Sequence, residues 1–193
     1  MQLIFIFLAA AIVNNFVLTQ FLGLCPFIGV SKKLSSSVGM GLAVMFVITL
    51  SSAASHVAYH NLLVRFEIQY LHLITFILTI ASLVQFLEIV LKKTLPALYS
   101  SLGVFLPLMT TNCMIVGVAI INMSRSYTFV ESMVNALGGG AGFLIAIVVF
   151  SGIRERMDRS SDVPKVFRGF PIALIAAGLM SLIFVGFSGL IRL

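Results

Sequence analysis

The chain has no tryptophan, few charged residues and only two cysteines. Asp, Glu, Lys and Arg make up 9% of its 193 residues, whereas 60% are hydrophobic. Soluble domains carry about a quarter charged residues, so this composition excludes an ordinary soluble domain. Two cysteines exclude a disulfide framework. The net charge of +6 does not indicate nucleic-acid binding, because the cations form no basic stripe with interleaved aromatic residues.

Long intervals without a charged residue define the class of protein. A helix rises about 1.5 Å per residue and needs about 20 apolar residues to cross a membrane. Continuous apolarity without alternation argues against a β-barrel. We therefore expect an all-α membrane protein, in contact with lipid, that forms a single integral membrane domain over residues 1–193. Its six predicted transmembrane helices lie in Met1–Ser31, Leu34–Val64, Ile68–Leu87, Thr94–Ser124, Ser132–Ile153 and Gly169–Ile191.

The basic residues predict the orientation of the chain in the membrane. Nine of the 12 Lys and Arg residues fall in the first, third and fifth connections between spans. Positive connections stay in the cytoplasm, so both termini are expected on the opposite side. Residues Met1–Val13 lack a basic region and a small-residue cleavage site, which favours a retained first helix over a removed signal peptide.

The first cysteine lies well inside a charge-free interval that is longer than one straight helix requires. Gly23, Cys25 and Pro26 occur together there. Proline removes an amide donor and disfavours helix at the preceding residue. We expect the helix to break near Cys25 and a short helix to begin with Pro26 in its first turn.

The fourth interval repeats this pattern around the second cysteine. Pro107 interrupts the interval, and Thr110, Thr111 and Asn112 offer helix-capping oxygens immediately before Cys113. The first and fourth helices are therefore both predicted to be broken.

The two halves of the chain, about 1–93 and 94–193, are predicted to be repeats. Their superposition aligns Cys25 with Cys113 and the glycines of the second span with those of the fifth. Each half crosses the membrane three times, so the second half has the opposite orientation. Inverted repeats with broken helices place their sites near the membrane midplane.

Other intramembrane polar residues are weaker candidates for a site. Asn14, Asn15 and Glu88 would suit an ion path, although Glu88 stands four residues before Lys92 and better suits an ion pair at the membrane boundary.

Two further polar segments have simpler interpretations. His56 and His60 stand one helical turn apart, but no further metal ligand is evident in the sequence, which favours a structural or pore-lining role. The segment Arg154–Arg168 mixes acids and bases, and we expect a solvated loop there.

The two thiols suit metal ligation, although a membrane cysteine is commonly only a small apolar residue. Amide groups at a helix start favour a thiolate, and soft ligands select Zn, Cu(I) or iron–sulfur clusters. A [2Fe–2S] cluster usually needs four cysteines. Cys25 and Cys113 thus form an incomplete site or half of a site that a partner completes. The residues expected around them are Gly23, Pro26, Thr111 and Asn112.

Longer motifs surround these residues and run through the whole chain. They are Val13–Leu18, Phe21–Phe27, Val30–Lys33, Gly103–Leu108, Thr111–Cys113, Ile153–Arg156, Asp162–Pro164 and Ala177–Met180. Together they resemble the RnfA family, called RsxA in some enteric bacteria, within the wider NqrDE/RnfAE family. RnfA proteins are membrane subunits of Rnf ion-translocating electron-transport complexes.

This resemblance implies a cofactor, partners and a location. Cys25 and Cys113 would ligate half of a [2Fe–2S] cluster, and the homologous RnfE subunit, inserted in the opposite orientation, would supply the other two cysteines. The further partners would be the Rnf subunits B, C, D and G. The chain would be a multi-pass protein of the bacterial inner membrane with both termini in the periplasm.

The resemblance also implies a function. Rnf complexes pass electrons between ferredoxin and NAD, coupled to translocation of Na⁺ or H⁺, and in some bacteria they keep the redox sensor SoxR reduced. The chain contains no nucleotide-binding glycine loop and no flavin signature, so NAD and flavin are expected on other subunits. No catalytic activity is expected from this chain alone.

Three alternatives stay open at this point. An NqrE-type subunit of the sodium-pumping NADH:quinone reductase shares the fold and both cysteine positions, but tends to differ around Asn14, Asn15 and Pro26. A stand-alone secondary transporter would use the repeats for alternating access. A structural scaffold would carry inert thiols.

Overall fold

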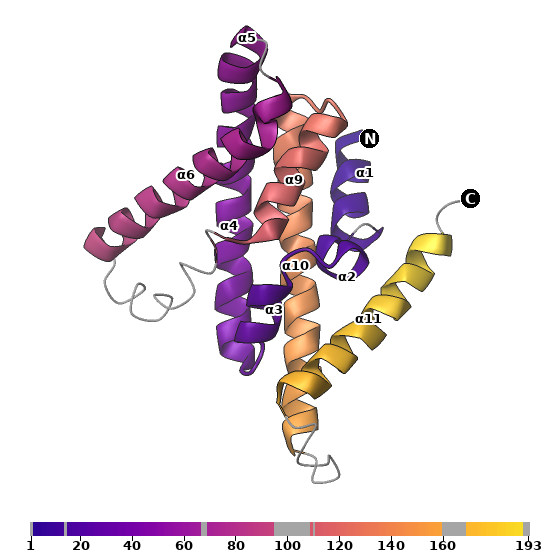
Figure 1. Cartoon of the computed structure of the whole chain (residues 1–193). Coiled ribbons are helices and arrows are strands. Elements are labelled where there is room, and N and C mark those ends of the chain that lie inside the picture. The colour runs from indigo at the N-terminus through magenta and orange to yellow at the C-terminus, as the bar shows by residue number, and fades with distance from the viewer. Residues whose placement is uncertain are drawn as a thin grey trace.

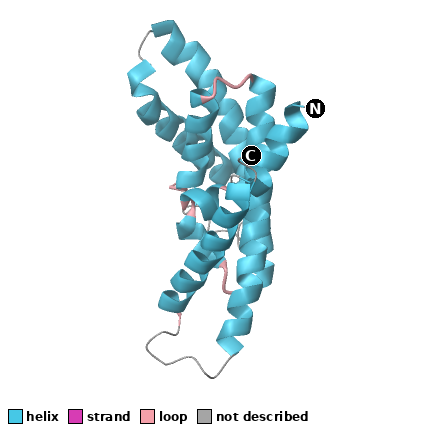
Figure 2. Cartoon of the chain, turned by 90° about the vertical axis from the view of Figure 1, so that its right-hand side faces the viewer, coloured by secondary structure: helices cyan, strands magenta, loops and turns pink. Residues whose placement is uncertain are grey.

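The computed structural model describes residues 2–13, 15–66, 69–94, 109, 111–159 and 169–190. All regular secondary structure in these residues is helical (Figures 1 and 2). Among the described helices, three are long and apolar enough to cross a membrane, namely Leu34–Asn61, His72–Val90 and Phe129–Arg159. Shorter apolar helices cover Leu3–Val13, Cys113–Ser124 and Phe170–Gly186. The all-α membrane fold is confirmed at this level, and the six-span inverted repeat stays a prediction.

The first predicted span consists of several short helices. They are α1 (Gln2–Leu8), η1 (Ala9–Val13, a π-helical turn), α2 (Phe16–Gln20) and α3 (Leu24–Val30). The break before α3 was predicted, whereas the break before α2 was not. Asn15 caps α2, because its side-chain oxygen accepts a hydrogen bond from the backbone N–H of Val17 at 3.2 Å. Asparagine is a favoured N-cap residue for this reason.

Two long helices, α4 (Leu34–Ala58) and α10 (Phe129–Arg159), pack against each other at the centre of the molecule (Figure 1). Glycine permits their close approach, as small residues do in membrane helix pairs. A Cβ atom at Gly140 would lie 2.8 Å from Met45 Cα, and one at Gly41 would lie 3.2 Å from Leu144 Cα. Glycines of both spans thus lie where α4 and α10 are in contact.

The remaining helices surround this pair. The π-helical turn η2 (Tyr59–Leu63) and α5 (Val64–Phe66) extend α4, and η3 (Gln69–Leu71) leads into α6. Helix α6 (His72–Thr94) packs against α4 and α9 (Cys113–Ser124), whereas α11 (Phe170–Leu190) packs against α2 and α3. Helices α6 and α11 lean away from the centre on opposite sides (Figure 1).

The outward surfaces of these two leaning helices are apolar. Exposed side chains include Ile74 and Leu78 on α6, and Leu182 and Ile183 on α11. Surface of this kind and extent is costly in water and matches the hydrocarbon region of a membrane.

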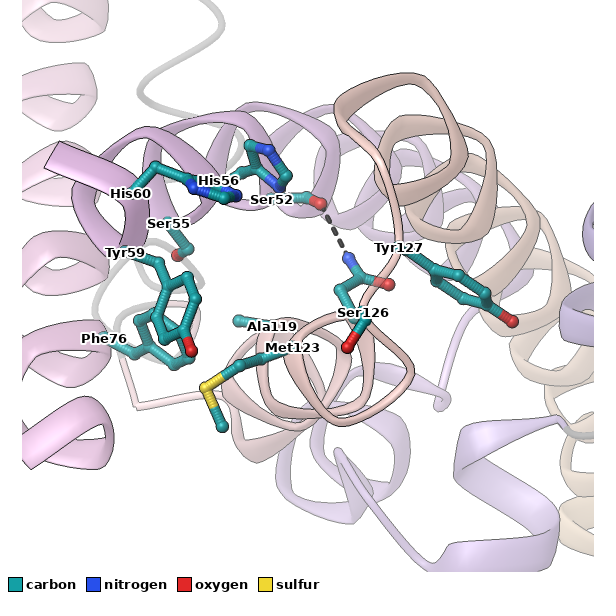
Figure 3. A pocket seen from close by; sticks show the side chains of 11 residues that line it. Ser52, Ser55, His56, Tyr59, His60, Phe76, Ala119, Met123, Ser126 and Tyr127 are labelled. Carbon is teal, nitrogen blue, oxygen red and sulfur yellow. Dashed lines mark hydrogen bonds between the residues drawn. The ribbon is translucent and has the colours of Figure 1, made fainter. Parts of the chain in front are cut away.

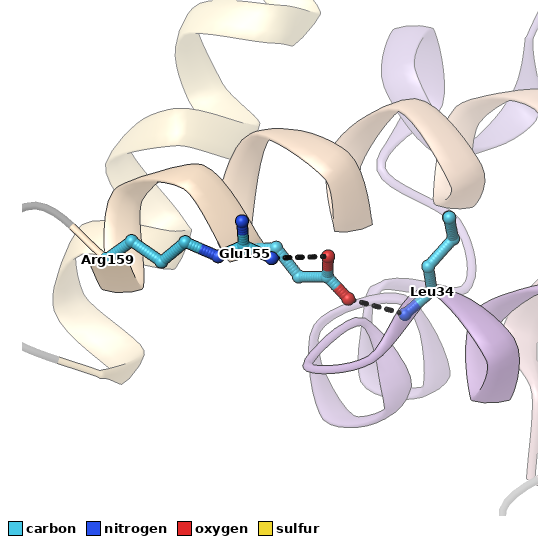
Figure 4. Close-up of polar contacts among 3 residues, drawn as sticks. All are labelled: Leu34, Glu155 and Arg159. Atoms are coloured by element: carbon cyan, nitrogen blue, oxygen red, sulfur yellow. Dashed lines mark hydrogen bonds and ion pairs between the residues drawn. The ribbon is translucent and has the colours of Figure 1, made fainter.

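A carboxylate joins the end of α10 to the start of α4. Glu155 accepts a hydrogen bond from the backbone N–H of Leu34 at 3.1 Å and lies 3.9 Å from the guanidinium of Arg159 (Figure 4). A negative charge at a helix N-terminus is stabilising, and Lys33 provides no side-chain cap there. Helix α10 runs on through Arg159, so the expectation of a solvated loop that starts at Arg154 is wrong for its first residues.

Candidate functional site

Cys25 is the second residue of α3, and backbone conformation rather than a side-chain cap places it there. Phe21 and Gly23 both have left-handed backbone angles, with φ of 57° and 82°, and Gly23 makes no side-chain capping bond as the N-cap residue. Pro26 follows in the first turn, where its missing N–H has no intrahelical partner to lose. The predicted break at this cysteine is confirmed.

Cys113 is the first residue of α9, and a side-chain cap sets its position. Asn112 has an extended conformation, and its Oδ1 accepts a hydrogen bond from the backbone N–H of Met114 at 3.0 Å. This is the capping interaction that the sequence predicted for Asn112. Thr111 is exposed, and Pro107 and Thr110 lie outside the described residues.

The two cysteine segments lie against each other, although 88 positions separate the thiols in the chain. The backbone N–H of Gly23 donates a hydrogen bond to Cys113 Sγ at 2.9 Å. A Cβ atom on Gly23 would lie 3.0 Å from Asn112 Oδ1 and 3.2 Å from Met114 Cβ. Glycine is therefore required at position 23 for its backbone angles and for this close approach.

Both thiols are exposed on the surface of the chain. Cys25 opens into a groove of about 560 Å³ between α3, α10 and α11, lined by residues that include Ile28, Lys32 and Phe170. Cys113 opens into a groove of about 660 Å³ between α6 and α9. A second protein chain can therefore reach both sulfurs.

The Cys25 groove also contains a buried cation. Arg154 is 4% exposed, and its Nη1 atom donates hydrogen bonds to the carbonyl oxygen of Ile28 at 2.6 Å and to Ser31 Oγ at 3.0 Å. These contacts satisfy polar groups at the C-terminal end of α3, where a positive charge is favourable. Within the described part of the chain, no carboxylate lies within ion-pair distance of Arg154. Sequence reasoning missed this residue, because nothing in the sequence separates it from the other cations of its cluster.

Asn15 and Glu88, two of the three residues proposed for an ion path, line neither cysteine groove. Asn15 is 1% exposed, and besides capping α2 it donates a hydrogen bond to the carbonyl oxygen of Gly142 at 2.9 Å. Glu88 lies on α6. Asn14 lies outside the described residues.

The residues present fit half of a thiolate-bound iron–sulfur site. The two cysteine segments are in contact, both sulfurs are accessible, and Cys113 Sγ already accepts a backbone N–H. Hydrogen bonds to the ligand sulfurs are a feature of iron–sulfur sites. In the ranges that the structure covers, no group of three or more His, Cys, Asp or Glu side chains is placed to hold a metal ion. The described residues thus offer two ligands of the four that such a cluster usually takes.

The fold defines a helical membrane protein with two exposed cysteines near helix starts, and comparison with known proteins identifies the family. Residues 3–191 match the family described as "Rnf-Nqr subunit, membrane protein". The chain belongs to this family, as its resemblance to RnfA predicted.

Similar proteins are matched over nearly their whole length. The chain is 54% identical to the A-subunit of the Na⁺-translocating ferredoxin:NAD⁺ oxidoreductase complex of Acetobacterium woodii, with 98% of each chain covered. It is 52% identical to the A-subunit of the ion-translocating oxidoreductase complex of Serratia proteamaculans, over 99% of this chain and 98% of the relative. The corresponding protein of Syntrophotalea carbinolica is 51% identical, with 98% of each chain covered.

Proposed function

We propose that this chain is the A-subunit of an ion-translocating ferredoxin:NAD⁺ oxidoreductase of the Rnf type. In this proposal it is a membrane component of an electron-transfer complex and has no catalytic activity alone. The names of its relatives support the proposal, since each is called the A-subunit of an ion-translocating oxidoreductase complex. The coupling ion is Na⁺ or H⁺.

In this proposal Cys25 and Cys113 hold half of a [2Fe–2S] cluster, and a homologous subunit supplies the other two cysteines. The hydrogen bond between the Gly23 N–H and Cys113 Sγ carries the argument, because it brings the two cysteine segments together. The cluster would supply one-electron transfer within the membrane. Asn112 and Gly23 position the cysteines, and the exposure of both sulfurs leaves room for the partner.

The arrangement of the helices supports the proposed inverted repeat of residues 1–93 and 94–193. Cys25 is the second residue of the short helix α3 and Cys113 is the first residue of α9. The long helices α4 and α10 form the central pair, and α6 and α11 lean to opposite sides (Figure 1). Six spans with both termini in the periplasm of a bacterial inner membrane fit this order and the distribution of basic residues. The family assignment to membrane proteins supports the location.

The remaining partners are proposed to be RnfE and the Rnf subunits B, C, D and G, with NAD and flavin bound by those subunits. Reduction of SoxR in some bacteria would be a property of the whole complex. An NqrE-type role is less well supported, because the relatives named above are all A-subunits of ferredoxin-linked or ion-translocating oxidoreductases.

Electron paramagnetic resonance of the purified, reduced complex tests the proposal. Replacing Cys25 or Cys113 by alanine is expected to remove the signal of one iron–sulfur cluster. A matched control is Ser124→Ala on α9, which should keep the full signal. Among the described residues, the Ser124 hydroxyl donates a hydrogen bond to the carbonyl oxygen of Ile120 on the same helix. An unchanged spectrum in both cysteine variants would contradict the proposed ligands.

A further inference from the structure

A polar cavity of about 170 Å³ lies apart from both cysteine grooves, between α4, η2, α6 and α9 (Figure 3). Its polar lining includes Ser52, Ser55, His56, His60 and Asn122, and Phe76 and Met123 close other sides. No Lys, Arg, Asp or Glu side chain among the described residues lines it. Polar residues within membrane helices are costly and are commonly functional.

Part of the cavity wall is fixed by a network of hydrogen bonds. Asn122 Nδ2 donates to Ser52 Oγ at 2.9 Å, and Asn135 Nδ2 donates to Asn122 Oδ1 at 2.7 Å (Figure 3 shows the first of these). Ser52 Oγ in turn donates to the carbonyl oxygen of Ser132 at 3.2 Å. These polar groups satisfy one another by hydrogen bonding, without a ligand.

Ser55 differs from this network. Ser55 lines the cavity, its side chain is 2% exposed, and its hydroxyl has no hydrogen-bond partner within the described part of the chain. Buried hydroxyl groups are normally paired, and an orphan of this kind indicates a missing ligand or water. A group that offers or accepts a polar contact in the cavity would satisfy it.

His56 and His60 line the same cavity and bring two imidazole rings to its rim. Their ring centroids are 4.7 Å apart with an interplanar angle of 48°, and Figure 3 shows the two rings side by side. Two imidazoles on one tetrahedral metal ion, with bonds of about 2.0–2.1 Å, place their ring centroids roughly 5 Å apart. Both rings make edge-to-face contacts with aromatic side chains. The ring centroids of Phe129 and His56 are 5.5 Å apart, and those of Tyr59 and His60 are 5.7 Å apart.

We propose that His56 and His60 form a binding site for a divalent d-block cation of the Zn²⁺, Ni²⁺ or Cu²⁺ class. Imidazole is a preferred ligand of these ions, and two histidines one helical turn apart present their rings on one face. Water and the Ser55 hydroxyl complete the coordination. Among the described lining residues no cation repels the ion and no carboxylate neutralises it, so binding is reversible and weaker than at a structural zinc site. The proposal does not depend on the proposed electron-transfer function.

Titration of the purified full-length chain with Zn²⁺, against a competing chelator dye, tests this site. The two cysteines are first alkylated so that they cannot bind the metal. Replacing His56 or His60 by alanine is expected to weaken Zn²⁺ binding by at least about tenfold. The chain has three histidines, and His72, which does not line the cavity, provides the matched control: His72→Ala should bind Zn²⁺ as tightly as the unsubstituted chain.

Equal affinity in the His56 and His60 variants, or an equal loss in His72→Ala, would overturn the proposal. X-ray absorption of the Zn²⁺-bound, unsubstituted chain adds a test that needs no variant to fold. Scattering from two imidazole rings is the expected result, and a spectrum without imidazole scattering would also overturn the site.

Discussion

The segments that carry Cys25 and Cys113 reach similar positions by different means. At Cys113 a neighbouring side chain caps the helix, because Asn112 accepts the N–H of Met114. At Cys25 no side chain caps the helix start, and the backbone of Gly23 makes the turn with φ of 82°. The Cys25 helix is also short and is held at its far end by Arg154, on a different helix. A local side-chain cap therefore sets the start of the Cys113 helix, whereas the Cys25 helix starts at a glycine turn and is held at its end by a residue of a distant helix.

The largest effect is expected where the two segments touch. Gly23→Ala should lower the free energy of unfolding by about 2–4 kcal/mol, because it forces alanine into left-handed angles and adds a methyl against Asn112 and Met114. Thermal unfolding in detergent, followed by circular dichroism, measures the change. Gly39→Ala is the control, since nothing lies within 4 Å of its added Cβ; a comparable loss in that variant would refute the close-approach explanation.

The next largest loss of stability is expected at the C-terminal end of α3. Arg154→Met should cost about 1.5–3 kcal/mol, because it leaves the Ile28 carbonyl and the Ser31 hydroxyl without their charged donor. Alkylation of the free chain by a maleimide should then accelerate at Cys25 more than at Cys113. Arg159→Met, at a side chain that is 82% exposed, should change stability by less than about 0.5 kcal/mol. Equal acceleration at both thiols would show that Arg154 has no specific relation to α3.

A smaller effect is expected from the local cap. Asn112→Ala should destabilise the chain by about 1 kcal/mol through loss of the bond to the Met114 N–H. Asn112→Ser keeps an oxygen acceptor and should recover most of that loss, because the Asn112 Nδ2 has no partner to lose among the described residues. Identical unfolding temperatures for the alanine and serine variants would argue against capping.

The smallest loss of stability is expected at Glu155, which caps α4 at an exposed position. Comparison with Arg154 shows how much more a buried contact stabilises the chain. Glu155→Ala removes the acceptor for the Leu34 N–H and should cost about 0.3–1 kcal/mol at low salt. The difference should shrink in high salt, because salt screens exposed charges. Persistence of the full effect at high salt would mean that the interaction is not electrostatic.

The sequence predicted the features that depend on neighbouring residues. The break at Gly23 and Pro26 and the cap at Asn112 follow from the conformations that these residues favour. The long central helices follow from charge-free intervals. In each case the residues that determine the feature lie within a few positions of it in the sequence.

Contacts between distant segments could not be predicted in this way. Arg154 lies 126 positions from Ile28, and Gly23 lies 90 positions from Cys113. The sequence suggests only an ion path for Asn15, because its capping role depends on a break that no proline marks. The cavity beside His56 also depends on how three helices pack, so the oxygens near the histidine pair could not be foreseen.

The iron content of the purified complex tests most directly whether the two cysteines share one centre. We predict that Cys25→Ser, Cys113→Ser and the double variant each lose the same iron and acid-labile sulfide, equivalent to one [2Fe–2S] cluster. Losses in the single variants that add up to a larger loss in the double variant, or full iron content in either single variant, would contradict a shared cluster.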